Sequence, residues 1–330
     1  MPAVAPNAVE RVWPSTEDLF RTEVIAGLTT RPRTLSPRWF YDRRGSELFE
    51  AITQLPEYYL TRAERGILLG HAGEIARIAG TGRALIELGS GSSLKTPLLL
   101  KALAPAAYVP IDISGEFMHE AAAALGEHFP ALSICPIAAD FMRPFTLPSS
   151  VRNLPRLGYF AGSTIGNMTV PVAVDFLRTT ARTLGEDALL LIGIDRLKDP
   201  KRLIAAYNDA QGVTARFNLN LLHRINRELR GTIPVEGFRH VALWNDYEAR
   251  IEMHLQAVRD IDFTVAGKSF LIAEGETIHT ENTLKYGPRD ARTLLRAGGW
   301  SPIAEWTDPE GFFALLLASS PSSSTLAAWP

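Results

Sequence analysis

The chain has 330 residues, and its 34 lysines and arginines nearly balance its 36 aspartates and glutamates, which leaves a formal net charge of −2. This balance excludes attachment to nucleic acid or anionic membranes through overall charge, and 46% hydrophobic with 21% charged residues excludes a disordered or fibrous chain. The single cysteine, Cys135, excludes an internal disulfide, and no apolar run is long enough for a transmembrane helix.

These features favour a cytoplasmic protein that binds neither nucleic acid nor membrane. None of the seven histidines makes a metal-ligand pair at helical spacing, so we predict no metal site. Cys135 is expected to be a buried, small apolar residue. Because no heptad pattern is present, nothing favours assembly, and we expect a monomer.

The first predicted elements alternate between apolar runs and helical patterns. Strands are predicted at residues 84–88, 108–112, 133–137, 156–161 and 188–194, and helices at residues 95–103, 115–128 and 170–184. Strands that alternate with helices pack as βαβ units on a parallel sheet. We therefore predict an α/β fold with a doubly wound sheet.

The pattern changes after Asp195. A long helical region, broken near Gly212, is predicted at residues 199–230, followed by strands at residues 241–244, 250–258 and 264–272. A helix at residues 290–297 and strands at residues 303–306 and 312–318 come last. The last two strands are expected to form a hairpin that closes the first sheet.

This order predicts two domains. Residues 63–196 and 288–330 would form the domain that contains the doubly wound sheet. Residues 1–62 and 197–287 would form a second, discontinuous α+β domain, of which the latter segment is inserted before the sheet is completed.

The strand at residues 84–88 runs directly into Gly89, Ser90 and Gly91. Ligands bind at this place in open α/β sheets, where glycines let the backbone approach a nucleoside. Asp112 ends the next predicted strand, at the spacing where a carboxylate accepts hydrogen bonds from ribose hydroxyls. The glycines could also make only a tight turn, but Asp112 and the predicted hairpin favour the nucleoside site.

The glycine motif is incomplete for a dinucleotide. Ser92, Ser93 and Leu94 follow Gly91, so the third glycine of G-x-G-x-x-G is missing. An acidic residue, Glu87, that opens a short glycine loop is similar to the first motif of class I S-adenosylmethionine-dependent methyltransferases. Further along, Asp140 and Phe141 could bind and stack on an adenine, although Asp140 could equally cap a turn.

Ten short motifs carry a resemblance to one family, and they run in that family's order. They are LSPRWFYD (35–42), GSELF (45–49), LPEYY (55–59), TRAE (61–64), ELGSGSSLKT (87–96), GSTIGN (162–167), AYND (206–209), FN (217–218), RIEM (250–253) and TENTLKY (280–286). The chain thus resembles the histidine-specific methyltransferase family. Motifs of this number and length rarely occur together by chance. The ten motifs together are therefore strong evidence for the resemblance, whereas any one of them alone would be weak.

The resemblance implies a class I methyltransferase domain that binds S-adenosyl-L-methionine, releases S-adenosyl-L-homocysteine and carries an additional substrate-binding domain. It implies three successive in-line methyl transfers to the α-amine of L-histidine. The product would be Nα,Nα,Nα-trimethylhistidine (hercynine), an intermediate of ergothioneine biosynthesis.

The resemblance also implies residue roles. Cofactor binding is expected at Glu87, Gly89, Ser90, Gly91, Lys95, Asp112, Asp140 and Phe141. Substrate binding is expected at Tyr41, Tyr58, Gly162, Asn167, Tyr207, Met253, Glu281 and Thr283. Of these, Tyr41 and Asn167 are the expected catalytic residues.

These residue types suit the expected chemistry. Asn167 offers hydrogen bonds to an α-amine and a carboxylate without adding charge. Glu281 would accept a bond from an imidazole N–H, and Thr283, two residues on, reaches the same face of a strand. The family pattern has serine at the position of Thr283, so the threonine keeps the hydroxyl and adds a methyl group.

Three other interpretations stay open at this level. Another aromatic amino acid, such as tryptophan or tyrosine, or a histidine derivative could be the substrate. A nicotinamide-dependent dehydrogenase would have to bind a pyrophosphate at the incomplete glycine motif. A protein that binds the cofactor without turnover would retain the same fold.

Overall fold

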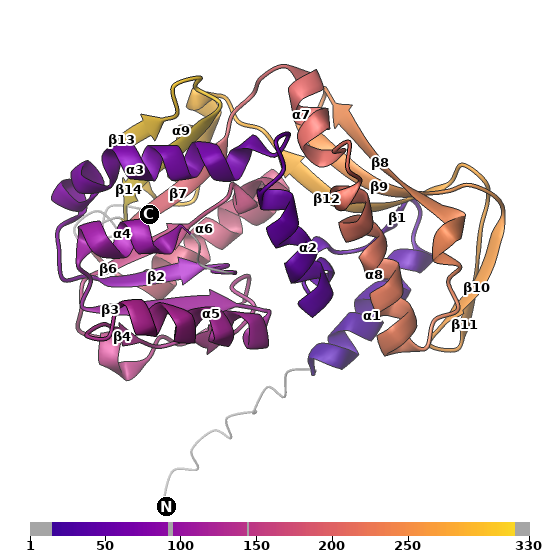
Figure 1. Ribbon diagram of the computed structural model, residues 1–330, viewed down its shortest axis with the longest axis horizontal. Helices are drawn as coiled ribbons and strands as arrows, with labels where there is room; N and C mark the ends of the chain where they lie inside the picture. The colour runs from indigo at the N-terminus through magenta and orange to yellow at the C-terminus, as the bar shows by residue number, and fades with distance from the viewer. Residues whose placement is uncertain (1–14, 92–94, 144, 321–330) are drawn as a thin grey trace, which may run out of the picture.

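The computed structural model describes residues 15–91, 95–143 and 145–320. Its strands form two main sheets, which Figure 1 shows as two lobes with helix α2 (Arg43–Thr53) between them. Ser92, Ser93 and Leu94 of the glycine motif lie outside the described residues. No helix within the described ranges is long and apolar enough to cross a bilayer.

The larger sheet confirms the doubly wound prediction. Its strands are β2 (Ala84–Leu88), β3 (Ala107–Asp112), β4 (Ser133–Ile134), β5 (Ile137–Ala138), β6 (Arg156–Phe160), β7 (Leu189–Asp195), β13 (Ser301–Thr307) and β14 (Phe313–Ser319). They lie in the order β13-β14-β7-β6-β2-β3-β4, and β5 also pairs with β3. The strands from β2 to β7 pair in parallel, whereas β14 runs antiparallel to both β7 and β13. The predicted closing hairpin is therefore confirmed.

Helices cover both faces of this sheet (Figure 1). They are α3 (Tyr59–Ala79), α4 (Thr96–Leu103), α5 (Gly115–His128), α6 (Val170–Leu184) and α9 (Pro288–Ala297), with short 3-10 turns η2 (Ser149–Val151) and η3 (Thr164–Asn167). Strand β2 is buried at all of its positions, because neighbouring side chains enter opposite cores. Its carboxyl end can therefore present a glycine turn on a rigid support.

The smaller sheet has the order β1-β12-β9-β8. Its strands are β1 (Arg33–Thr34), β8 (Phe238–Asn245), β9 (Arg250–Ala257) and β12 (Thr277–Leu284), and β10 (Ile261–Val265) pairs with β11 (Lys268–Ile272) in a separate hairpin. The helical elements of this lobe are α1 (Thr16–Thr29), η1 (Pro37–Phe40), α2, α7 (Pro200–Tyr207), α8 (Val213–Leu229) and η4 (Val235–Gly237). Alternate residues of β9 are buried, as expected for a sheet with one covered face.

Asp42 connects the N-terminal segment to the smaller lobe. Its carboxylate accepts a bond from the Gly45 amide at 2.7 Å, which caps the start of α2. The same carboxylate accepts bonds from Asn220 at 2.8 Å and Arg227 at 2.6 Å, both on α8. Because these bonds hold the start of α2 against α8, the neighbouring Tyr41 is held beside the same helix.

Two predicted strands were wrong, because each is divided into two shorter strands. The single strand predicted at residues 264–272 is divided by a two-residue turn, in which Ala266 and Gly267 have φ values of 49° and 79°. Positive φ at both positions matches a tight hairpin turn. The strand predicted at residues 133–137 is divided into β4 and β5 by Cys135 and Pro136, since proline cannot donate to a ladder.

Other features were missed or differ in burial. Helices α1, α2 and α3 had no sequence prediction, and the predicted domain boundary after residue 62 falls inside α3. Cys135 is half-buried and was wrongly expected to be fully buried, since its Sγ lies 3.7 Å from Ser133 Oγ and 3.8 Å from Ser150 Oγ at a partly open edge.

Candidate active site

The turn after β2 is built mainly from backbone hydrogen bonds. The amides of Gly89 and Ser90 donate to the carbonyl of Ile111 at 2.8 and 3.2 Å, and the Gly91 amide donates to the Asp112 carboxylate at 2.9 Å. Gly89 and Gly91 have φ values of 71° and 50°, in the region that favours glycine. This arrangement brings Asp112 against the glycine turn, as the sequence predicted.

Phe141 packs directly against the turn. A Cβ added to Gly89 would lie 3.2 Å from its ring. Asp140, the neighbouring predicted residue, accepts a bond from Arg38 of η1 at 2.8 Å and from the Met142 amide at 2.9 Å. The structure therefore places Asp140 at a bridge between the two lobes, a contact that the sequence did not predict.

Glu87 and Lys95 are engaged within the protein. Glu87 is buried and accepts bonds from Tyr108 at 2.5 Å and Thr96 at 2.8 Å, while its burial raises its pKa to about 7. Lys95 forms an ion pair with Glu64 of α3. Both side chains thus bond to neighbouring protein groups on either side of the glycine turn, and they hold its two ends in place.

Glu64 was missed by the sequence prediction, although it lies within the TRAE motif. It is fully buried, and its carboxylate accepts bonds from the Gly162 amide at 3.0 Å and the Tyr159 hydroxyl at 3.1 Å in addition to the Lys95 ion pair. A buried carboxylate requires such partners. Glu64 therefore connects Lys95, which follows the glycine turn, to the loop that begins at Gly162.

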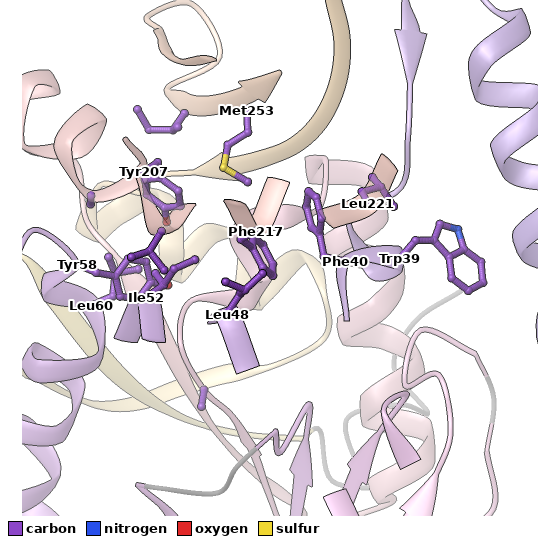
Figure 2. Packing of buried hydrophobic residues seen from close by; sticks show 14 of the residues in the cluster. Trp39, Phe40, Leu48, Ile52, Tyr58, Leu60, Tyr207, Phe217, Leu221 and Met253 are labelled. Carbon is purple, nitrogen blue, oxygen red and sulfur yellow. The ribbon is translucent and has the colours of Figure 1, made fainter. Parts of the chain in front are cut away.

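A cavity opens beside that loop and between the two sheets. It contains all eight residues predicted to bind substrate. Its lining residues are Tyr41, Phe49, Ile52, Tyr58, Gly162, Ser163, Thr164, Asn167, Ala206, Tyr207, Thr214, Phe217, Met253, Glu281 and Thr283. Figure 2 shows Met253 pointing toward Phe217, with Tyr207 and Tyr58 on one side of them.

A β-bulge turns Glu281 and Thr283 toward this cavity. Before the bulge His279 pairs with His254, and after it Glu281 pairs with Met253, so Thr280 is the extra residue. Without the bulge, Glu281 would point to the opposite face of the sheet, because side chains alternate along a strand. The Thr280 hydroxyl donates to the Met253 carbonyl at 3.0 Å and stabilises the irregular register.

Buried titratable groups lie among the apolar and aromatic residues that line the cavity. Burial raises the pKa of Glu281 to about 8, despite the nearby Lys285 and a bond from the Asn167 amide at 2.9 Å. Burial also raises the pKa values of the Tyr41, Tyr58 and Tyr207 phenols well above their ordinary value. These phenols are therefore neutral donors near pH 7.

Aromatic rings surround the Tyr41 end of the cavity. The ring of Tyr41 lies 5.6 Å from that of Phe49 and 5.8 Å from that of Phe217, in edge-to-face contacts. The rings of Tyr58 and Tyr207 lie 6.1 Å apart. Such walls can bind a cationic group through the faces of their rings while adding no positive charge.

A second group of titratable residues lies on the opposite face of the smaller sheet. Glu252, His254 and His279 place their possible ligand atoms within 4.8 Å of one another. The two imidazoles stack at 4.8 Å with an angle of 24°, and Glu252 accepts a bond from Arg250 at 2.7 Å. His254 Nε2 lies 3.0 Å from a carboxylate oxygen of Glu252, and His279 Nε2 lies 3.0 Å from the Glu281 carbonyl, so both rings are hydrogen-bonded within the protein.

The comparisons with known proteins agree with the geometry. A sequence profile described as "Histidine-specific methyltransferase, SAM-dependent" matches residues 20–320. The histidine N-alpha-methyltransferase of Mycolicibacterium smegmatis is 42% identical over 311 residues, which cover 92% of this chain and 96% of that protein. Ergothioneine biosynthesis protein 1 of Neurospora crassa is 34% identical over 89% of this chain, which spans 34% of that longer protein.

A solved structure was also matched. The S-adenosylmethionine-dependent methyltransferase from Clostridium acetobutylicum aligns with a TM-score of 0.49 and 11% identity, covering 84% of this chain and 99% of that one.

Proposed function

The chain belongs to the S-adenosylmethionine-dependent, histidine-specific methyltransferase family, and from this premise we propose that it methylates the α-amine of L-histidine. It is an N-methyltransferase, and its product is Nα,Nα,Nα-trimethylhistidine, made for ergothioneine biosynthesis. S-Adenosyl-L-homocysteine is the second product. The observation that carries this proposal is one cavity, beside the loop that begins at Gly162, in which Asn167, Tyr207, Glu281 and Thr283 meet.

The turn after β2 has the features that the cofactor requires. The Ser90 hydroxyl oxygen is buried and has no hydrogen-bond partner among the described residues. A side chain at Gly89 would enter the space next to Phe141, so only glycine leaves room there. We propose that Asp112 binds the ribose, that Phe141 and Asp140 contact the adenine, and that Lys95 contacts the carboxylate end.

When bound, S-adenosylmethionine supplies a methyl group on a positively charged sulfur. The residues of the cavity then have to hold the amine nitrogen in line with that methyl carbon, and positioning of this kind supplies much of a rate acceleration. We assign this task to Asn167 and Tyr41. Asn167 lies at the end of η3, and the Gly162 end of the same loop lies next to Lys95.

The two ends of the substrate would meet different groups. Asn167 and Tyr207 would bind the α-amino and carboxylate groups, while Glu281 and Thr283 would bind the imidazole with Met253 beside the ring. In the described structure Asn167 donates to Glu281, and Tyr207 lies 3.1 Å from Thr283. Histidine would therefore replace the Asn167–Glu281 bond when it binds.

The aromatic wall suits an amine that gains methyl groups. Each transfer removes a hydrogen-bond donor from the nitrogen and enlarges it, so later intermediates depend on shape and on ring faces. Tyr41 and Phe49 offer such faces, and the phenol of Tyr58 remains neutral. Three transfers are therefore compatible with one site.

We also propose the domain assignment given by the sequence. Residues 63–196 and 288–330 would form the cofactor domain, and residues 1–62 and 197–287 would form the substrate domain, except that the first turn of α3 (Tyr59–Ala79) belongs with the rest of that helix to the cofactor domain. The separation into two sheets supports this division. A cytoplasmic location and a monomeric state stay predictions.

Mass spectrometry of the reaction products tests the function. Incubation with S-adenosylmethionine and L-histidine should yield products heavier by one, two and three CH₂ units, with the trimethylated form accumulating last. Tryptophan and tyrosine serve as competing substrates in parallel reactions. Methylation of tryptophan without methylation of histidine would assign the chain another substrate within the family, and no product with any of them would favour a protein without turnover.

A further inference from the structure

A buried lysine lies behind two residues of the cavity. Lys285 is 3% exposed, and its ammonium lies 2.6 Å from Asp195 Oδ2, 3.0 Å from Thr283 Oγ1 and 3.1 Å from Tyr207 Oη. An ammonium has three protons and no lone pair. Its three protons are therefore used by these three oxygens, and both hydroxyl oxygens act as acceptors toward Lys285.

The two hydroxyl groups also bond to each other. Tyr207 Oη and Thr283 Oγ1 lie 3.1 Å apart, so one of their two protons is shared between them. A phenol is the more acidic hydroxyl, and it is the better donor. When Tyr207 donates to Thr283, both lone pairs of the Thr283 oxygen are occupied, and its own proton is left for the cavity. Tyr207 keeps its second lone pair, which can accept from the substrate's α-amine, so the carboxylate is left to the Asn167 amide.

The cavity then presents one acceptor and one donor on the same strand. In its ionised form the Glu281 carboxylate accepts, and Thr283 donates. A neutral imidazole matches both, because it has one ring N–H and one ring nitrogen with a free lone pair. An indole and a phenol lack that second nitrogen, and an imidazolium has two N–H groups and no lone pair to offer.

We propose that Lys285, held by Asp195, is a positioning residue that makes the cavity selective for a neutral imidazole. It acts through Thr283 and Tyr207 by occupying their lone pairs, so that Thr283 can donate to a ring nitrogen but cannot accept from a ring N–H. This inference rests on the proposed function, in which histidine is the substrate.

The charged and titratable groups around Lys285 come from several elements. They are Tyr58 and Tyr59 at the start of α3, Asp195 at the end of β7, Lys198 after it, Tyr207 of α7 and Glu281 of β12. Asp195 also accepts bonds from Lys198 at 2.5 Å and from Tyr59 at 2.8 Å. Removal of Lys285 therefore leaves Asp195 paired, which favours folding of the variant.

The pH dependence of kcat/KM for histidine tests the proposal with Lys285→Met. In the wild type, kcat/KM should fall at low pH as the imidazole of the substrate is protonated, around the ordinary imidazole pKa of about 6.5. We call this low-pH decline the acid limb. In Lys285→Met, a freed lone pair on Thr283 can accept from an imidazolium, so this acid limb should move down by about one pH unit, with KM at neutral pH raised about tenfold. The kcat value should change less than KM.

Lys198→Met is the matched control. It removes the other lysine bound to Asp195 and leaves the contacts of Lys285 with Thr283 and Tyr207 in place. Its acid limb should coincide with that of the wild type. Coincidence of the Lys285→Met limb with the wild type, or an equal shift in Lys198→Met, would overturn the proposal.

Two variants of Thr283 keep the proposal testable if Lys285→Met does not fold. Thr283→Val removes the donor that favours a ring nitrogen with a free lone pair, so the preference for the neutral imidazole falls and the acid limb should move down for this different reason. Thr283→Ser keeps the hydroxyl and should retain the wild-type limb. An unshifted limb in Thr283→Val would contradict the inference. Absence of histidine methylation by the wild type at every pH would instead contradict the proposed function itself.

Discussion

The glycine turn after β2, where we propose cofactor binding, and the cavity between the two sheets, where we propose substrate binding, are built in different ways. The turn uses consecutive residues after β2, and backbone amides make most of its hydrogen bonds. The cavity collects side chains from both lobes, and its polar groups are buried carboxylates and phenols whose pKa values are shifted by that burial. The turn should therefore be sensitive to backbone shape, and the cavity to charge and hydrogen bonding.

The largest expected effect is in the cavity. Above about pH 8, where Glu281 is ionised, Glu281→Ala should weaken histidine binding by roughly 1.5–3 kcal/mol, the scale of a hydrogen bond to a charged group, while S-adenosylhomocysteine binding stays nearly unchanged. Calorimetric titration of each ligand measures both. Equal losses for the two ligands would mean that the variant has a folding defect and that the regions are not independent.

The stability of the ligand-free protein should depend on pH through Glu281. Its pKa rises from 4.5 in the unperturbed group to about 8 in the folded protein. Between these values the folded state holds a proton that the unfolded state has released, so stability should fall as pH rises, by at most about 1.4 kcal/mol per pH unit.

Urea unfolding between about pH 5 and pH 8 measures this slope. Glu281→Gln should have a flatter profile, because its amide does not titrate. Glu87, whose pKa is raised to about 7 by burial, contributes a slope of the same sign and is present in both proteins. If the stability of the wild type and of Glu281→Gln changed with pH in parallel, the titrating group would not be Glu281 and would lie outside the cavity.

A smaller effect is expected at the cofactor turn. Gly89→Ala places a Cβ 3.2 Å from the Phe141 ring at a φ of 71°, and the strain of a left-handed residue is about 1–2 kcal/mol. S-Adenosylhomocysteine affinity should fall roughly tenfold, while the kcat for histidine at saturating cofactor falls less. Gly82→Ala is the matched control, since it has a φ of 72° and open space around it. Gly82→Ala should lower stability without changing cofactor affinity. If Gly82→Ala lost as much cofactor affinity as Gly89→Ala, the effect at Gly89 would not be local.

The smallest effect concerns the bridge between the lobes. Arg38 and Asp140 form a partly exposed ion pair at 2.8 Å, worth less than about 1 kcal/mol. If Asp140 contacts the adenine, Arg38 competes with the adenine for the Asp140 carboxylate. Arg38→Met removes this competition and should raise cofactor affinity about two- to fivefold. Arg43→Met, which breaks the exposed Arg43–Glu120 pair between α2 and α5, should leave the affinity unchanged. A lower affinity in Arg38→Met would show that the bridge supports the cofactor site instead.

Much of the larger lobe was predictable from sequence. Buried parallel strands are continuous apolar runs, and the glycine turn and the hairpin have local signals. Helices α5 and α6 begin and end where the sequence predicted. The smaller lobe was harder, because short strands such as β10 and β11 are separated by a turn of Ala266 and Gly267 that lacks a strong turn dipeptide.

From the sequence alone we predicted the doubly wound sheet and the glycine turn with Asp112, and the family resemblance added eight of the residues that line the cavity. How those residues are oriented and paired depends on the three-dimensional arrangement of the chain. The bulge at Thr280 turns Glu281 and Thr283 toward Met253, and a single inserted residue leaves no periodic signal. Likewise, Lys285, Asp195 and Glu64 become partners of the site only through folding, because hydrogen bonds and burial join segments that are distant in the chain.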